Sequence, residues 1–221
     1  MTGMVDTVNM TLPRATYRHG DLAGALHAAG VQLARAGGPE AVVLREATRR
    51  AGVSPNAAYR HFADRRALLR AVCATAMAQL ATAMETRQAA LPGDLPPADA
   101  ARARLRAVGA AYLQYAQDEP GLFRTAFAVA DELTPEAPGA GPSGLTPYEL
   151  LSQALDGLVE AGLLAPLRRP DAELLAWSSV HGLSMLLIDG PLRHLDKTHA
   201  SAVAAQLLDH IEVGLIGAET D

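Results

Sequence analysis

A short stretch in the first third of the chain, AGVSPNAAYRHFADRRALL (residues 51–69), concentrates side chains that could bind an anionic polymer. Tyr59, Arg60 and His61 follow one another, and Asn56 stands four residues before Arg60. A phenol, a guanidinium and an imidazole can all hydrogen-bond phosphate oxygens, and an asparagine amide can bond the edge of an adenine. This set of side chains therefore indicates contact with nucleic acid.

The distribution of charge points the same way. The chain of 221 residues has a formal net charge of −5. Residues 1–70 nevertheless contain ten arginines against five carboxylates, a balance of +5, whereas residues 71–221 contain nine bases against nineteen acids, a balance of −10. The asymmetry predicts a basic N-terminal unit that meets a polyanion and an acidic remainder that does not.

Helix signals around this stretch predict a helix-turn-helix over residues 41–62. One helix is expected from about 40 to 51, and Gly52 ends it. Ser54 then stands as an N-cap, with Pro55 in the first position of a short helix over 55–62. Such a second helix has to fit the major groove of DNA with its exposed side chains facing base edges.

Helical periodicity continues along the rest of the chain, and no strand pattern competes with it. A first helix begins near residue 20, a fourth is capped by Asp64, and Pro120 opens a sixth; the last three lie near 147–164, 171–189 and 199–216. Residues 132–147, with four prolines, are expected to form a surface loop. The chain is therefore predicted to be all-α, with about nine helices.

Composition supports this fold class and limits the chemistry. Hydrophobic residues make up 49% of the chain and aromatic residues only 4%, which predicts an aliphatic, helical core. A single cysteine, Cys73, excludes an intramolecular disulfide framework and a multi-cysteine metal site. No signal peptide and no apolar run of membrane-spanning length is visible, so we expect a cytoplasmic protein without a membrane, metal or cofactor partner.

The stretch quoted above resembles the DNA-binding region of the tetracycline-repressor (TetR) family. That family pattern is A-G-V-S, three variable residues, a small or apolar residue, Y-x-H-F, two residues, a base, and two leucine-like positions. The resemblance extends over residues 18 to about 72. It implies a helix-turn-helix domain at 17–66 and a helical effector-binding and dimerisation domain at 67–217. Residues 1–16 show no periodicity and are expected to form a flexible arm.

Carried over by position, the resemblance assigns contacts to individual residues. Tyr59 and His61 match positions that touch phosphates, and Arg65 stands at the family's usual lysine, also a phosphate contact. The variable positions that read base edges are held by residues 55–57, with Arg60 as a further contact. The predicted DNA-binding set is Arg45, Thr48, Ser54, Pro55, Asn56, Ala57, Tyr59, Arg60, His61 and Arg65.

Two residues depart from the family pattern. Val43 occupies the start of the second helix, where the family usually has a threonine that bonds phosphate. Arg45 is therefore predicted to take over that role. Thr48 replaces a small apolar residue.

The acidic remainder contains a helix that is apolar nearly all round, ELLAWSSVHGLSMLLIDGPL (173–192). Small residues on it would allow another helix to approach closely. The last helix has an apolar stripe, and Asp209 and Glu212 mark its solvent-facing side. Together with the same pair from a symmetry mate, these helices would form a four-helix dimer interface. The predicted interface residues are Ser178, Gly182, Val203, Leu207, Ile211 and Leu215.

Most of the few aromatic residues lie in this part of the chain and could line an apolar pocket for a small-molecule effector. The motif W-x-x-x-H-G also resembles a C-terminal domain variant of the TetR family named for its Trp-His-Gly (WHG) sequence. Aromatic residues at helical spacing belong to a core more often than to a pocket, so both interpretations stay open. The predicted effector-binding residues are Tyr112, Tyr115, Phe123, Phe127, Trp177, His181 and Met185.

Together these features predict a transcriptional regulator, a repressor that binds a palindromic operator in double-stranded DNA as a homodimer and is released by an effector. An enzyme is disfavoured because the sequence contains no nucleophile motif, no phosphate-binding glycine loop and no paired metal ligands. A sequence-tolerant DNA-packaging protein is the remaining alternative. It would require basic charge spread more widely than this chain offers.

Overall fold

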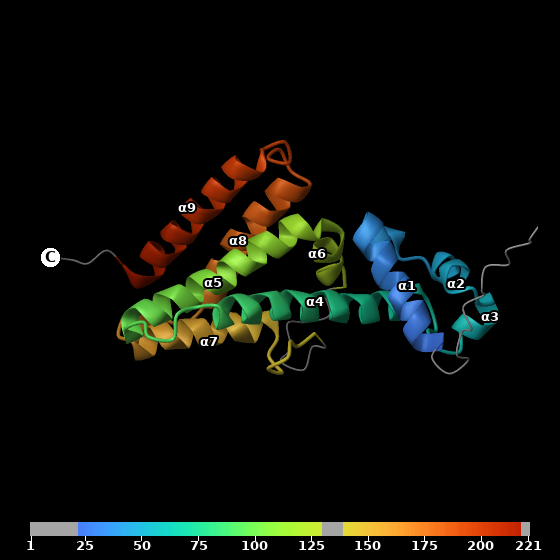
Figure 1. The fold of residues 1–221 in the computed structure, drawn as a ribbon, viewed down its shortest axis with the longest axis horizontal. Coiled ribbons are helices and arrows are strands. Elements are labelled where there is room, and N and C mark those ends of the chain that lie inside the picture. Colours follow the sequence, from blue (N-terminus) through green and yellow to red (C-terminus); the bar gives the residue numbers. More distant parts are fainter. Residues whose placement is uncertain (1–21, 130–138, 218–221) are drawn as a thin grey trace, which may run out of the picture.

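The computed structural model describes residues 22–129 and 139–217, and every regular element within these ranges is helical. Nine α-helices and two short 3₁₀ segments follow one another, which confirms the predicted all-α class (Figure 1). Their bounds are α1 Leu22–Gly37, η1 Pro39–Ala41, α2 Leu44–Ala51, α3 Pro55–Ala58, α4 Arg65–Ala89, α5 Pro97–Asp118, α6 Pro120–Ala126, α7 Pro147–Glu160, η2 Pro166–Arg168, α8 Ala172–Ile188 and α9 Lys197–Ile216.

Helices α1 to α3 form a small unit at one end of the molecule, and α4 to α9 form a larger body (Figure 1). α2 begins four residues later than its periodicity suggests, because Pro39–Ala41 form η1 and Val43 is extended. α3 is also shorter than predicted. After Ala58 the chain closes with turn bonds from the amides of Arg60 and His61 to the carbonyls three residues earlier.

The local signals that delimit the helix-turn-helix are confirmed. Gly52 ends α2 in the left-handed region, with φ of 69°. The hydroxyl of Ser54 accepts a hydrogen bond from the amide of Ala57 at 3.4 Å. At the start of α4, the carboxylate of Asp64 accepts a hydrogen bond from the amide of Ala67 at 2.7 Å. These caps satisfy amides that a helix end otherwise leaves free, so they set the two ends of the α3 segment.

α4 is the longest helix and connects the two parts. At a rise of about 1.5 Å per residue its 25 residues span about 37 Å. By length and composition alone it could cross a membrane, contrary to the expectation that no segment of this chain would. Its apolar side chains instead pack against α1, α5, α6 and α7, and this burial accounts for its composition.

The small unit meets the body at the short helix α6, whose first turn lies directly on the last turn of α1. A Cβ at Gly121 would overlap the carbonyl oxygen of Ala34 and lie 2.5 Å from that of Arg35. The side chain of Arg35 continues this contact with an ion pair to Glu119, Nε to Oε2 at 2.8 Å. Only glycine allows the two backbones to approach this closely.

We therefore predict that Gly121→Ala destabilises the protein. The new methyl group would push α6 away from α1, at a cost of about 1–3 kcal/mol in the free energy of unfolding. Thermal or urea unfolding measures the change.

Gly157→Ala is the matched control, because a Cβ at Gly157 in α7 meets nothing within 4 Å. That substitution should stabilise the helix by about 0.5–1 kcal/mol. Equal effects of the two substitutions would contradict the close α1–α6 contact.

Candidate functional site

The surface around α3 presents the polar side chains singled out in the sequence. Asn56, Tyr59, Arg60 and His61 are exposed, and Tyr59 keeps 59% of its surface accessible. Within the described part of the chain, no hydrogen bond or ion pair engages any of these four side chains. A phenol, a guanidinium, an imidazole and an amide are therefore available together to an external ligand.

Packing of the small unit aims these side chains outward. Ala58 at the end of α3 is fully buried, and Phe62 in the following turn packs against the core, so residues 55–62 are held by the side that carries these two residues. Ala57 is half-buried at the edge of the exposed face. The predicted inward and outward faces of α3 are thus confirmed.

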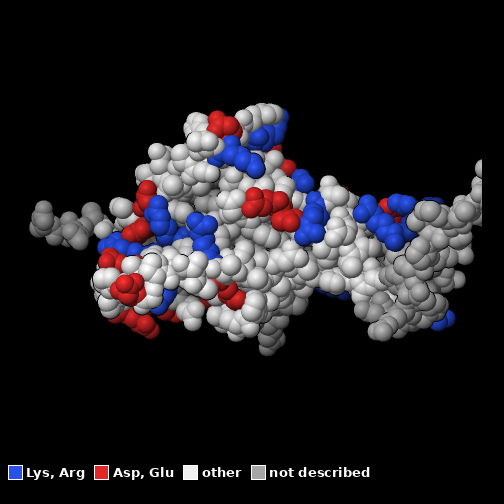
Figure 2. Space-filling view, viewed as in Figure 1, with Lys and Arg blue, Asp and Glu red and all other residues white. Residues whose placement is uncertain are grey.

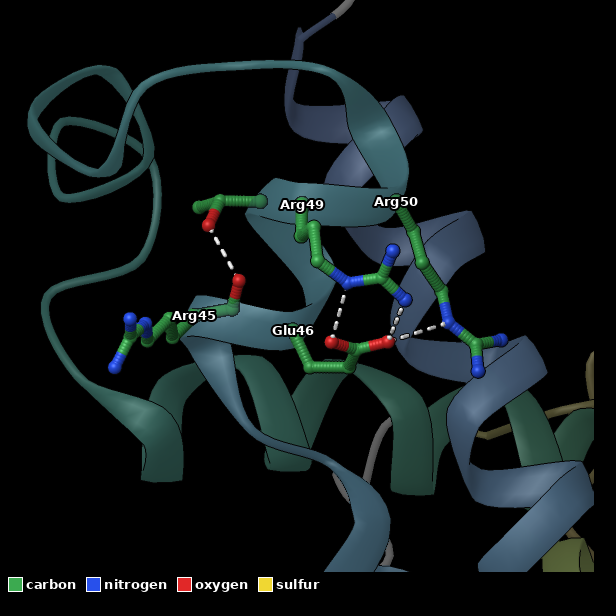
Figure 3. A network of polar contacts seen from close by, with 5 residues as sticks. Arg45, Glu46, Arg49 and Arg50 are labelled. Atoms are coloured by element: carbon green, nitrogen blue, oxygen red, sulfur yellow. Dashed lines mark hydrogen bonds and ion pairs between the residues drawn. The ribbon is translucent and has the colours of Figure 1, made fainter.

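Arginines gather on the small unit (Figure 2). On α2, the carboxylate of Glu46 accepts hydrogen bonds from Nε and Nη2 of Arg49 at 2.8 and 2.6 Å and from Nε of Arg50 at 3.2 Å (Figure 3). These hydrogen bonds, the Arg49 contact first, lower the pKa of the Glu46 carboxyl to about 2. Arg45 is exposed, and its guanidinium has no partner among the described residues.

The Glu46 cluster was missed in the sequence, although spacings of three and four residues along one helix predict such pairs. It changes how much charge the unit offers to a polyanion. Arg49 and Arg50 share one carboxylate, whereas Arg45 and Arg60 have no internal counter-charge among the described residues.

Two predicted DNA-binding residues make hydrogen bonds to other parts of the protein: Thr48, which is buried, and Arg65, whose side chain stays 43% exposed. Thr48 is 2% exposed, and its hydroxyl donates to the carbonyl of Arg45 at 2.7 Å, so it does not lie on this surface. The guanidinium of Arg65 donates to the carbonyls of Val42 and Pro39. Pro55 begins α3, and its side chain lies outside the described atoms.

A second cluster of functional groups lies in the body, where α5, α6 and α8 meet. The rings of Tyr112, Phe123, Phe127, Trp177 and His181 lie in mutual contact. The centroids of Phe127 and His181 are 4.9 Å apart, and those of Trp177 and His181 are 6.0 Å apart. Tyr112 and Phe123 are buried, whereas Phe127, Trp177, His181 and the nearby Met185 remain partly accessible.

A chain of hydrogen bonds runs through these rings. The indole of Trp177 donates to the hydroxyl of Tyr112 at 3.0 Å, and that hydroxyl lies 2.7 Å from Nδ1 of His181. If the hydroxyl donates to Nδ1, its proton has a partner, and the proton of the imidazole sits on Nε2. Burial lowers the pKa of His181 and raises that of Tyr112, so both groups are neutral at pH 7.

Tyr115 does not belong to this cluster. Its hydroxyl donates to the carbonyl of Ala76 on α4 at 3.2 Å, and its ring borders a separate open groove of about 580 Å³ between α4 and α5. The groove is lined by both polar and apolar side chains, Gln79, Gln114 and Ala83 among them. The spacing of Tyr112 and Tyr115 along α5 did not show that they face different neighbours.

α8 and α9 form an antiparallel pair at the edge of the body (Figure 1). Ser178 and Gly182 on α8 are exposed, as predicted for an interface, and Val203, Leu207 and Ile211 on α9 are half-buried. Leu215 is only 6% exposed and belongs to the core of the protomer, so it cannot serve a partner in this arrangement. Large apolar side chains that were not predicted for the interface are also exposed on the pair, namely Leu174, Leu175, Leu186 and Val213.

The acidic side of α9 has a different role from the predicted one. Glu212 accepts from Arg102 of α5 at 2.7 Å, and Asp209 pairs with Arg106 of the same helix. These residues attach α9 to α5 at the edge of the core. The side of α9 that was predicted to face solvent is therefore a half-exposed contact with α5.

Comparison with known families identifies both parts of the chain. Residues 26–72 match the family model of bacterial regulatory proteins of the tetR family, and residues 105–211 match the tetracyclin repressor-like C-terminal domain. The two matches stand in the order that the fold requires and together cover more than half of the chain.

The chain belongs to the TetR family. It is a DNA-binding transcriptional regulator of that family and not an enzyme, and the predicted helix-turn-helix is confirmed. The C-terminal match is to the general repressor-like domain and does not single out the WHG type. A search among curated proteins found no match.

Solved structures share the TetR fold over nearly the whole chain. A protein of unknown function from Rhodococcus sp. RHA1 is 26% identical, with a TM-score of 0.69 over 92% of this chain and 100% of its own. A tetR-family regulatory protein from Rhodococcus RHA1 is 19% identical, with a TM-score of 0.59 over 90% and 98%. A TetR variant from Acinetobacter baumannii AYE, solved in complex with minocycline, is 20% identical, with a TM-score of 0.60 over 88% and 98%.

From the lowered pKa of His181 we predict how the stability of this TetR protein depends on pH. Since the folded state binds a proton on His181 less readily than the unfolded state, acidification through the unfolded pKa should favour unfolding. Urea unfolding at about pH 7.5 and about pH 5.5 should show that this loss is larger in the wild type than in His181→Gln. Equal pH dependence of the two proteins would show that burial does not hold His181 neutral.

Proposed function

We propose that this chain is a ligand-responsive repressor that binds a palindromic operator as a homodimer and is released from it by a small-molecule effector. The proposed organisation is a DNA-binding domain at 17–66 and an effector and dimerisation domain at 67–217; the arm predicted at 1–16 lies outside the described residues. The arrangement that carries the proposal is an exposed set of side chains, Asn56 on α3 and Tyr59, Arg60 and His61 in the turn after it, which make no hydrogen bond or ion pair among the described residues. The cytoplasm, where DNA is accessible, is the proposed location.

Within this proposal the exposed residues divide into two roles. Asn56 and Arg60 read base edges, because an amide matches adenine and a guanidinium matches guanine in the major groove. Ala57 supplies a methyl contact beside them, and Ser54 and Pro55 shape the start of the helix. Tyr59, His61 and Arg45 bind phosphates, which positions the protein without reading sequence.

The first experiment is selection of bound fragments from the source genome by the purified protein, followed by footprinting at two salt concentrations. A regulator should give a short palindromic footprint. Asn56→Ala should then lose about 1–3 kcal/mol of discrimination at one base position, because the amide no longer pairs with its base.

Tyr59→Ala, in the turn directly after α3, is the matched comparison, and it should weaken binding to all sequences without changing the preferred one. Arg45→Ala should additionally reduce the slope of log K against log salt by about 0.9. Salt-sensitive binding without a footprint would favour a packaging protein and would reject the repressor.

Dimerisation is proposed through α8 and α9. Leu175 and Val213 are 64% and 62% exposed on these helices, and Gly182 leaves room for a close helix approach. Burial of such apolar surface against a second copy would remove it from water. A dimer of this kind binds an operator whose two half-sites are about 34–36 Å apart, one turn of the double helix.

The aromatic cluster is proposed as the effector site, with Trp177, His181, Phe127 and Met185 at its accessible side. The complex of the Acinetobacter protein with minocycline supports a search for small organic ligands. The tautomer with a proton on Nε2 of His181 offers a hydrogen-bond donor, and the surrounding aromatic rings favour an uncharged ligand. A largely apolar, neutral molecule with a hydrogen-bond acceptor fits these properties.

We also propose that this domain is of the WHG type, because Trp177, His181 and Gly182 have the spacing of that motif.

Trp177→Phe should alter the response to effector before it alters DNA binding. The operator affinity should stay within about threefold of the wild type, while the effector concentration that releases DNA should rise about tenfold or more. Since Trp177 is the only tryptophan of the chain, quenching of its fluorescence in the wild type reports binding at this place. Loss of operator binding in an intact dimer would instead assign Trp177 to the core.

A further inference from the structure

The turn between α1 and α2 is held by an arginine that belongs to a different part of the chain. Arg65 is the first residue of α4, directly after the N-cap Asp64. Its side chain extends back to residues 39–42, more than twenty positions earlier in the sequence. This contact joins the long helix of the body to the segment that leads into α2.

The guanidinium makes three contacts there. Nε donates to the carbonyl of Val42 at 2.8 Å, and Nη2 donates to the carbonyl of Pro39 at 2.7 Å. Nη2 also lies 3.3 Å from a carboxylate oxygen of Glu40, whose side chain is 90% exposed. The two carbonyl bonds fix the turn, whereas an exposed ion pair of this kind contributes little.

This turn determines where α2 begins. Val42 is fully buried and follows η1, and Val43 is the N-cap of α2 without a side-chain cap of its own. On the other side of the turn, a Cβ at Gly38 would lie 3.4 Å from the guanidinium of Arg124 on α6, which bonds Asp189 at the end of α8. Residues 38–42 therefore lie between two arginines of the body.

We propose that Arg65 is a positioning residue for DNA binding: it holds residues 39–42, and through them the start of α2, instead of contacting a phosphate. Nε and Nη2 bond the two carbonyls at once because the guanidinium holds its donors in a rigid planar fork, and a lysine ammonium cannot bond both in the same way. The lysine usual at this family position would therefore not substitute for Arg65 in this chain. The predicted effect of Arg65 on operator affinity rests on the proposed function, whereas its contact with residues 39–42 does not.

The first test uses the full-length protein without DNA. Amide hydrogen exchange is measured for wild type, Arg65→Lys, Arg65→Gln and the control Glu40→Gln. In both Arg65 variants the amides of Val42 and Val43, which bond within the turn, should exchange about tenfold faster or more.

The helices of the body should keep their exchange rates and the protein its melting temperature, which separates positioning from a general loss of stability. Glu40→Gln removes the ion pair but leaves the bonds from Arg65 to the two carbonyls, so the amides of Val42 and Val43 should exchange as in the wild type. Unchanged exchange in Arg65→Lys would overturn the proposal, and so would acceleration throughout the protein.

The second test measures operator affinity against salt. If Arg65 positions α2, Arg65→Lys should lose about tenfold in affinity although its charge is kept. If Arg65 contacts a phosphate, Arg65→Lys should bind as the wild type, and Arg65→Gln should lower the salt slope by about 0.9, as Arg45→Ala does.

The phosphate result would overturn the inference and leave the proposed regulator intact. If the wild type shows no sequence-specific binding, the proposed function fails. The exchange measurement in the free protein still decides whether Arg65 holds the turn.

Discussion

Burial of α4 is the constraint on which the rest of the molecule depends. The unit of α1 to α3 is too small to bury a sufficient core alone, and its helices are short. Leu68 and Val72 of α4 complete that core, and they approach Gly30 of α1 so closely that a Cβ there would lie 2.9 Å from Val72. Farther along, Leu80 and Met84 of the same helix belong to the core of the body. A single apolar helix therefore ties the orientation of the DNA-binding surface to the packing of the C-terminal domain.

A second connection runs through α6 and brings the two functional regions onto one packed element. Phe123 lies on this helix and Phe127 caps its end, and both rings belong to the aromatic cluster. Gly121 in its first turn touches the carbonyls that end α1. A molecule that displaces these rings would act on a helix of seven residues in direct contact with the DNA-binding unit. The short distance between the regions follows from the glycine, which lets the helices meet without side chains between them.

The electrostatics of the small unit differ from its formal charge. Several of its arginines are bonded internally: Arg49 and Arg50 share Glu46, and Arg35 bonds Glu119. Arg65, at the start of α4, likewise bonds backbone carbonyls. Phosphates would have to compete with these partners for the same donors. The salt dependence of DNA binding should therefore reflect fewer ion contacts than the excess of arginine suggests. Arg45 and Arg60, which have no partner among the described residues, are the side chains most available for such contacts.

Features that depend on neighbouring residues could be predicted from the amino-acid sequence. Periodicity defined the all-α class, and Gly52, Ser54 and Asp64 marked helix ends through bonds that span three residues. The same local pattern separated the buried Ala58 from the exposed Tyr59 and Arg60. Only the tertiary structure decided which partner a side chain meets far along the chain. Arg65 bonds a turn more than twenty residues away, Tyr112 joins Trp177 and His181 while Tyr115 faces α4, and Leu215 enters the core. These outcomes follow from how helices cross, because helical spacing defines the face of a residue but not the element that covers it.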